Sequence, residues 1–316
     1  MANQANAPAA TPTQQRDLSA HVARIGKQDK IATGILTAIV GFVLLLLAAI
    51  IVYILARGGG IALTPGFLTN PSTDEAVSGI LYQLFDSFYM LLITLLISVP
   101  ISLGGAIFLV EYAPDNWITS AASTAIETLS SLPSIVVGMF GSLFFVVVMG
   151  WGISIISGAV ALTMFNIPIL VRTIQQALED VPRSQRDAAL AMGLTRWETT
   201  VNVLLPAAMP AIVTGIVISA GRVFGEAAAL IFTSGSAPSR LNFENVFNFS
   251  SPTNPFNIFR PACTLAVYIW RLTSEPTPGS TEIVWGTATV LIVCVLLFNV
   301  LARVLGKFLA RRLTAE

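Results

Sequence analysis

The sequence predicts an all-α membrane protein whose chain crosses the lipid bilayer six times. Composition is the first reason, because 54% of the 316 residues are hydrophobic and only 11% are charged, whereas soluble domains carry about 25% charged residues. The mean hydropathy of +0.77 agrees with this assignment. Arrangement is the second reason, because polar or glycine- and proline-rich segments separate six apolar runs, each long enough to cross a membrane.

The first two spans follow a polar N-terminal segment. Residues 1–30 are rich in Ala, Gln and Thr, which predicts a disordered cytoplasmic tail. The first transmembrane helix is expected over residues 31–56, since its apolar run covers about 37 Å at 1.5 Å per residue. A loop that contains the glycine triplet 58–60 is expected over residues 57–79, and the second span over residues 85–110.

The remaining spans are expected in the second half of the chain. A short polar link over residues 111–123 leads to spans predicted at residues 126–149, 153–177, 207–233 and 282–304. The link between the last two of these spans, residues 234–281, is rich in Pro, Asn and Phe and is expected to lie outside the cell. A basic cytoplasmic tail is expected over residues 306–316.

Lysine and arginine positions predict the orientation of these spans. With the N-terminus in the cytoplasm, twelve Lys and Arg residues fall in cytoplasmic segments, and only four fall in outer segments, namely Arg57, Arg240, Arg260 and Arg271. Positive residues concentrate on the cytoplasmic side of membrane proteins. The asymmetry therefore predicts that both termini lie in the cytoplasm.

Residues 178–206, LEDVPRSQRDAALAMGLTRWETTVNVLLP, form a polar stretch between two apolar runs. Pro182 suits the start of a helix, because its missing N–H falls where a helix has no internal partner. The following alanines favour helix, Gly193 interrupts it, and a second short helix is expected from Thr195 until Pro206 stops it. The predicted shape is two short helices outside the bilayer, joined at Gly193.

Two charged residues, Arg222 and Glu226, lie inside the predicted fifth span. An arginine at a helix centre costs about 2.5–3.5 kcal/mol on insertion scales, so it should face protein or water. A spacing of four residues places the two side chains on one helix face, where they can pair. Two interpretations stand side by side: a structural ion pair, or a guanidinium that faces a path for an anion such as phosphate, which its planar fork suits.

Arg172 closes the predicted fourth span and also has two interpretations. As an isolated residue, it is typical of a positive anchor whose side chain reaches the membrane surface. The alternative is a second contribution to an anion path.

Several function classes are disfavoured by what the sequence contains. The only histidine, His21, lies in the N-terminal segment, which argues against histidine-based triads and metal sites. The pattern G-x-x-x-x-G-K-[ST] does not occur, so the chain is not expected to bind ATP through a P-loop. Cys263 and Cys294 do not suggest a disulfide framework, and a formal net charge of zero suggests no nucleic-acid partner.

The spacing of Asp187-Ala188-Ala189, Gly193 and the final Leu204-Leu205-Pro206 resembles the EAA loop of ABC importer permeases, with Asp187 in place of the usual Glu. Three other stretches, together with Arg222-x-x-Gly225-Glu226, resemble the PstA-type permeases of bacterial phosphate ABC importers: 108–114 (FLVEYAP), 132–138 (LPSIVVG) and 168–172. That family continues Gly-Glu with Thr-Ala-Pro, whereas Ala227-Ala228-Ala229 follow here, so a contact from that threonine hydroxyl would be missing.

This resemblance implies a fold, partners and sites. It implies the type 1 ABC importer permease fold, with a permease core over residues 80–305. It implies a second, PstC-like permease, two PstB-like ATPase subunits that use ATP, and an external PstS-like phosphate-binding protein, all at the bacterial cytoplasmic membrane. Arg172, Arg222 and Glu226 would serve phosphate passage. Asp187, Ala188, Ala189, Gly193 and Pro206 would belong to the loop that docks on the ATPase.

Three alternatives remain open at the level of sequence. The first is an ABC permease for another oxyanion or solute, since the EAA-like loop does not distinguish solutes. The second is an ion-coupled secondary transporter, which should show inverted repeats; no convincing internal repeat is found. The third is a membrane enzyme, which the lack of a Cys/His cluster or paired acids in the spans disfavours.

Overall fold

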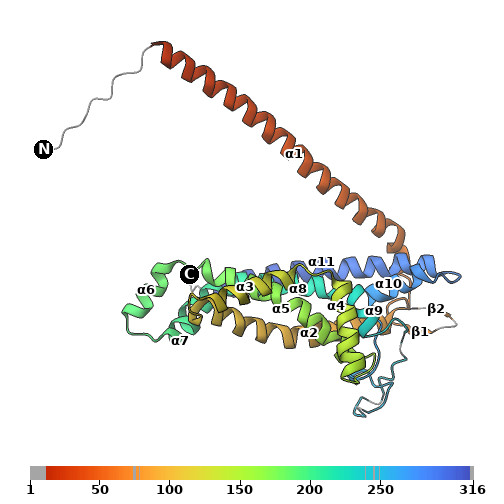
Figure 1. The fold of residues 1–316 in the computed structure, drawn as a ribbon. Helices are drawn as coiled ribbons and strands as arrows, with labels where there is room; N and C mark the ends of the chain where they lie inside the picture. Colours follow the sequence, from red (N-terminus) through yellow and green to blue (C-terminus); the bar gives the residue numbers. More distant parts are fainter. Residues whose placement is uncertain are drawn as a thin grey trace. The chain divides into compact units, whose positions relative to one another are not determined.

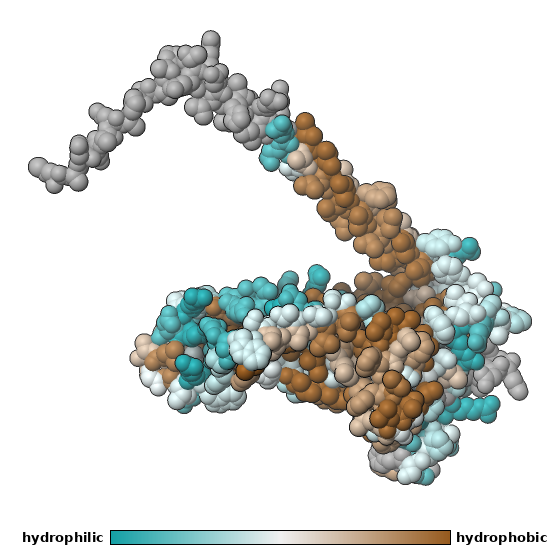
Figure 2. Space-filling view, viewed as in Figure 1, coloured by the Kyte–Doolittle hydropathy of each residue, from teal (hydrophilic) through white to brown (hydrophobic). Residues whose placement is uncertain are grey.

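The structure is a computed structural model that describes residues 12–73, 76–77, 79–238, 240–244, 246–248 and 250–313. It divides into two units, residues 1–55 and 56–316. Most of the first unit is the long helix α1 (Pro12–Ala62), whose residues 28–62 are apolar enough to cross a membrane. Figure 2 shows apolar side chains along this stretch. Residues 12–30 are helical, so the predicted disorder is wrong there, and residues 1–11 lie outside the described residues.

The glycine triplet at residues 58–60 lies in the last turns of α1 and not in the expected loop. Gly58 packs closely on α11 (Ser280–Leu313), where a Cβ on it would overlap the carbonyl oxygen of Trp285. Glycine lets two helix backbones approach each other in this way. Gly58 therefore serves helix packing, whereas a Cβ on Gly59 or Gly60 would meet no atom within 4 Å.

Four long helices lie side by side in the second unit: α2 (Leu81–Ile107), α5 (Ile155–Glu179), α8 (Leu205–Phe224) and α11 (Figure 1). One end of this bundle carries α6 (Arg183–Ala191), α7 (Arg196–Thr199) and the C-terminal end of α11. The opposite end carries α10 (Leu265–Ser274) and a hairpin of β1 (Ser72–Thr73) and β2 (Ala76–Val77). The segment predicted to be cytoplasmic and the C-terminal end of α11 thus share one end.

The predicted all-α fold is confirmed. Among the described residues, the only strands are the two-residue β1 and β2, which pair antiparallel with Ser72 opposite Val77. Five helices are long and apolar enough to cross a membrane on their own, and a sixth span arises if a bent pair of helices counts as one.

That bent pair replaces the predicted third span. Helix α3 (Trp117–Ser130) is followed after a bend of 101° by α4 (Ser134–Gly141) and the π-helical segment η2 (Ser142–Val148). The prediction of one uninterrupted span over residues 126–149 is wrong, because Pro133 disfavours helical geometry at the residue before it and cannot donate a backbone hydrogen bond. Helix α3 also begins within the expected polar link, where Asn116 accepts the N–H of Thr119 at 3.0 Å.

The predicted fifth span is also interrupted. Helix α8 ends at Phe224, and the short helix α9 (Ala228–Thr233) follows after three residues. The two interrupted spans meet, since α4 packs on α9 so tightly that a Cβ on Gly138 would lie 2.6 Å from the Cα of Ala229. The loop expected over residues 234–281 likewise contains a helix, α10.

Pro206 does not stop a helix, which corrects the sequence prediction. The chain continues from α7 through the π-helical segment η3 (Thr200–Leu204) into α8, and Pro206 lies in the first turn of α8. In a regular α-helix the proline ring collides with the carbonyl group four residues earlier. The wider turns of η3 lie immediately before the proline and relieve this collision.

Candidate functional site

Arg222 lies in the last turn of α8 and is exposed on the isolated chain. Its guanidinium carbon is 4.3 Å from the ring centroid of Phe165 on α5, which is a cation–π contact. A cation at a helix C-terminus is also favoured by the helix dipole. These interactions hold the arginine in place and leave its N–H groups available to an anion.

Glu226 does not share a helix face with Arg222, and no ion pair found in the described residues joins them. The predicted pairing is therefore wrong. The spacing rule assumes a continuous helix, but Gly225 is the C-cap of α8. The Oε1 atom of Glu226 instead accepts the backbone N–H of Ala229 at 3.3 Å, at the start of α9. A side chain that bonds a nearby backbone amide competes with helix continuation.

Arg172 lies within α5, two turns before its end, and pairs with Glu127 of α3 at 3.1 Å. Both side chains are open to solvent, with 40% and 71% of their surfaces exposed. Arg172 also lines a groove of about 370 Å³ together with Thr173, Gln176 and Asp180. An acidic partner and polar groove residues therefore surround Arg172.

The two arginines are not brought together. Helices α5 and α8 run antiparallel: Thr173 contacts Gly215, and Phe165 lies under Arg222. Phe165 and Arg172 are seven residues apart on α5, which corresponds to about 10 Å along the helix axis. Arg172 and Arg222 therefore occupy different depths along the same pair of helices.

A buried polar cluster between these depths was missed by sequence reasoning. Asn166 on α5 donates to Ser98 Oγ on α2 at 3.1 Å and accepts a hydrogen bond from Ser219 on α8. All three side chains are buried. Hydrogen bonds of this kind hold membrane helices together. The available signal was the presence of Ser, Thr and Asn within apolar runs.

The coupling segment, residues 178–206, has the predicted two-helix shape. Gly193 joins α6 to α7 with φ = +89°, a backbone conformation that glycine adopts without strain. Thr195 and Glu198 form a reciprocal capping box at the start of α7. Asp187 and Ala188 are exposed on α6, whereas Ala189 is buried against the rest of the protein.

Three large apolar side chains are exposed on this coupling segment, and sequence reasoning did not single them out. Leu190, Met192 and Trp197 are 42%, 76% and 59% exposed. Leu190 lies on α6, Met192 in the turn that follows it and Trp197 on α7, at the end of the molecule where the surrounding surface is largely hydrophilic (Figure 2). An exposed apolar group rimmed by polar residues is typical of a protein–protein contact.

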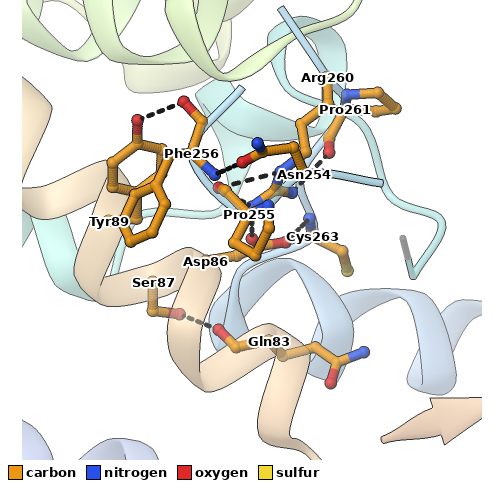
Figure 3. Close-up of polar contacts among 10 residues, drawn as sticks. All are labelled: Gln83, Asp86, Ser87, Tyr89, Asn254, Pro255, Phe256, Arg260, Pro261 and Cys263. Carbon is orange, nitrogen blue, oxygen red and sulfur yellow. Dashed lines mark hydrogen bonds and ion pairs between the residues drawn. The ribbon is translucent and has the colours of Figure 1, made fainter. Parts of the chain in front are cut away.

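A second polar cluster ties the segment after α9 to the start of α2 (Figure 3). Arg260, predicted to lie in an outer loop, is completely buried and bonds Asp86 Oδ1 at 2.6 Å, with side-chain exposures of 0% and 1%. Its Nε and Nη1 groups donate to the carbonyl oxygens of Pro255 and Pro261. The Oδ2 atom of Asp86 accepts the N–H of Cys263 at 3.1 Å.

The Cys263 thiol is enclosed in this cluster. Burial raises the pKa of the Cys263 thiol well above its usual range, and the negative charge of Asp86 raises it further. Thiolates are the reactive form of cysteine. Cys263 is therefore expected to be inert toward thiol reagents in the folded protein.

Comparison with known proteins places this arrangement in a family. The family described as "Binding-protein-dependent transport system inner membrane component" matches residues 102–315. The chain is 47% identical over 289 residues to the "Probable ABC transporter permease protein YqgI" of Bacillus subtilis (strain 168), covering 91% of this chain and 98% of that protein. It is 32% identical over 240 residues to the "Phosphate transport system permease protein PstA" of Yersinia pestis, covering 75% of each.

A solved structure supports the same fold. A permease chain in the crystal structure of a bacterial alginate ABC transporter, in complex with an alginate pentasaccharide-bound periplasmic protein, superposes with a TM-score of 0.61. The sequence identity is 14%, and the match covers 90% of this chain and 96% of that chain. The chain therefore belongs to the binding-protein-dependent transport system inner membrane components, and it is an ABC transporter permease of the type I importer kind.

Proposed function

We propose that this permease carries inorganic phosphate into the cell. The observation that carries the proposal is Arg222, which is exposed at the interruption between α8 and α9 and has no acidic partner among the described residues. A planar guanidinium donates two parallel hydrogen bonds to two phosphate oxygens. Relatives that are named phosphate transport permeases support this choice of solute.

The other predicted pathway residues have distinct proposed roles. Glu226 keeps α9 separate from α8 by bonding the amide of Ala229, and so shapes the interruption beside Arg222. Arg172, about 10 Å farther along α5, would offer a second positive charge near the coupling end once an anion displaces Glu127, its exposed partner. A solute site must bind strongly enough to admit an ion and weakly enough to release it. Two cations at separate depths meet this requirement better than one cluster.

The coupling segment is proposed to dock on a separate ATPase subunit. That partner, and not this chain, is proposed to hydrolyse ATP. Asp187, Ala188 and Gly193 lie on its exposed surface, while Ala189 and Pro206 attach it to the membrane helices. Met192 and Trp197 add exposed apolar area to the same surface. The proposed assembly contains a PstC-like second permease, two PstB-like ATPases and an external PstS-like phosphate-binding protein.

Reconstitution tests the proposed solute. The chain, its second permease, the two ATPases and the binding protein are placed in liposomes, and uptake of labelled phosphate is measured with ATP. Uptake should require ATP, should stop when the ATPase is inactivated, and should resist competition by sulfate. Uptake that persists without active ATPase would favour a secondary transporter. Transport of another solute in place of phosphate would favour an ABC permease for that solute. The name of the relative YqgI, a probable ABC transporter permease, specifies no solute.

Replacing Gly193 by valine is expected to weaken ATPase docking. A Cβ at this position meets no atom within 4 Å, so the whole effect comes from the positive φ. Strain of this kind costs about 1–3 kcal/mol, which corresponds to docking that is about fivefold to a hundredfold weaker. Gly193→Asn is the matched control, because asparagine tolerates this conformation. Gly193→Val protein that retains the ATPase on purification and transports normally would contradict the coupling role; Asp187→Ala is a milder test.

Cysteine labelling tests the proposed location of both termini in the cytoplasm. A Thr277→Cys variant should react with an impermeant thiol reagent added to intact cells, whereas Ser184→Cys should not. Both residues are exposed in the structure, at opposite ends of the bundle. The native protein should give little background from Cys263, which is buried. The opposite labelling pattern would overturn the proposed orientation.

A further inference from the structure

The last turns of the second span connect to the coupling segment through one ion pair. Helix α2 continues into the π-helical segment η1 (Phe108–Tyr112), which contains Glu111. Glu111 Oε1 accepts a hydrogen bond from Arg186 Nη2 on α6, the residue immediately before Asp187. The Glu111 side chain is only 8% exposed, so the carboxylate lies largely out of solvent.

Little else joins α6 to α2. Helix α6 packs mainly on α7 and η3, the two elements that follow it in the chain. Between η1 and the two short helices lies a cavity of about 230 Å³, lined by Val110 and Glu111 on one side and by Arg186, Leu190, Arg196 and Thr199 on the other. Because this space is not filled by apolar packing, the ion pair bridges it.

The contact is also concentrated in one place. Among the described residues, the Nε atom of Arg186 is buried without a hydrogen-bond partner, and Glu111 is the one partner found for its guanidinium. A charge-assisted hydrogen bond is shorter and stronger than a neutral one. This bond, between a largely buried Glu111 and an Arg186 side chain that is 30% exposed, holds α6 against the end of α2.

We infer that Glu111 and Arg186 are positioning residues for transport: their ion pair makes the inner end of α2 move together with the coupling helix α6. When the ATPase displaces α6, α2 follows, and so do the helices packed on it, α5 and α8, which carry Arg172 and Arg222. The inference rests on the proposed docking of the coupling segment on an ATPase, and it is independent of which solute is carried.

A distance measurement tests this movement directly. The native cysteines are first replaced by serine. One spin label is attached at Tyr112→Cys, at the end of η1, and the other at Ser184→Cys, in the first turn of α6; both positions are exposed. The fully assembled importer is compared without nucleotide and after trapping with ATP and vanadate. The label distance should stay the same in the two states. In Glu111→Gln protein it should shift or broaden on trapping.

Activity measurements separate positioning from simple stability. Glu111→Gln and Arg186→Gln importers should assemble and hydrolyse ATP at the basal rate, but the solute moved per ATP should fall about tenfold or more. The charge swap Glu111→Arg with Arg186→Glu should restore it. Glu179→Gln is the matched control, because Glu179 is exposed at the same end and bonds only Gln175 of its own helix in the described structure.

Three results would overturn the inference. The first is a label distance that already changes in the unaltered pair when the nucleotide state changes. The second is single variants that move as much solute per ATP as the control. The third is that the single variants fail to assemble and the charge swap restores assembly but not the solute moved per ATP. Absence of phosphate uptake in the unaltered importer would refute the proposed solute, but it would leave the distance measurement unaffected.

Discussion

Arg222→Gln is expected to abolish phosphate uptake although the importer still assembles. The substitution removes two charge-assisted hydrogen bonds to the anion, each of about 1.5–3 kcal/mol, and therefore about a hundredfold or more in rate. The structural cost is small, because the exposed guanidinium loses its contact with Phe165, about 0.5–1 kcal/mol at such sites, and its interaction with the helix dipole, about 0.3–1 kcal/mol. Arg222→Lys retains the charge but not the fork, so intermediate uptake is expected.

Uptake and complex yield should be measured for these variants together with Arg303→Gln, an exposed arginine on α11 that serves as the control. Glu226→Gln should transport nearly as well as the native chain, since the amide oxygen of glutamine can still accept the N–H of Ala229. If the double variant Arg222→Gln with Glu226→Gln recovers uptake, Arg222 merely balances Glu226, and its role in the anion path is refuted.

Arg260→Met should cause the largest loss of stability. It leaves the carboxylate of Asp86 buried without its cation, which costs about 3–5 kcal/mol. The carbonyl oxygens of Pro255 and Pro261 also lose their donors. The thermal unfolding midpoint of the purified protein should fall, and the segment after α9 should become sensitive to protease.

Two further variants make this result specific. Arg240→Gln changes an exposed arginine of the same segment, and such surface changes are usually within about 0.5 kcal/mol. Asp86→Leu combined with Arg260→Met should recover part of the stability, because no isolated charge remains buried. An unfolding midpoint of Arg260→Met equal to that of Arg240→Gln would show that the buried pair does not hold this segment in place.

Long apolar runs predicted the helices that form the bundle, because in lipid a continuous helix is the simplest way to satisfy every backbone group. The same reasoning missed both interruptions. Residues 131–133 and 225–227 lie inside the apolar stretches that predicted the third and fifth spans. Hydropathy therefore does not predict either interruption, and the only local indications are Pro133 and Gly225.

The charged residues show the same limit. The spacing of Arg222 and Glu226 predicted a pair because it assumed an unbroken helix, and that assumption failed at Gly225. The partner of Arg260 is Asp86, 174 residues away in the chain, so no local pattern relates them. By contrast, the bend at Gly193 and the start of the second short helix at Thr195 depend on nearby residues alone, and these predictions are confirmed.

The contact between α4 and α9 restricts how this protein can change over evolutionary time. A methyl group on Gly138 would meet the Cα and the carbonyl oxygen of Ala229, at 2.6 and 2.9 Å. These are backbone atoms, present whatever residue occupies position 229, so no second substitution in a side chain makes room. A lineage that acquires a new solute preference can exchange side chains around Arg222, but it inherits the glycine at 138 unless the two interrupted spans move apart together.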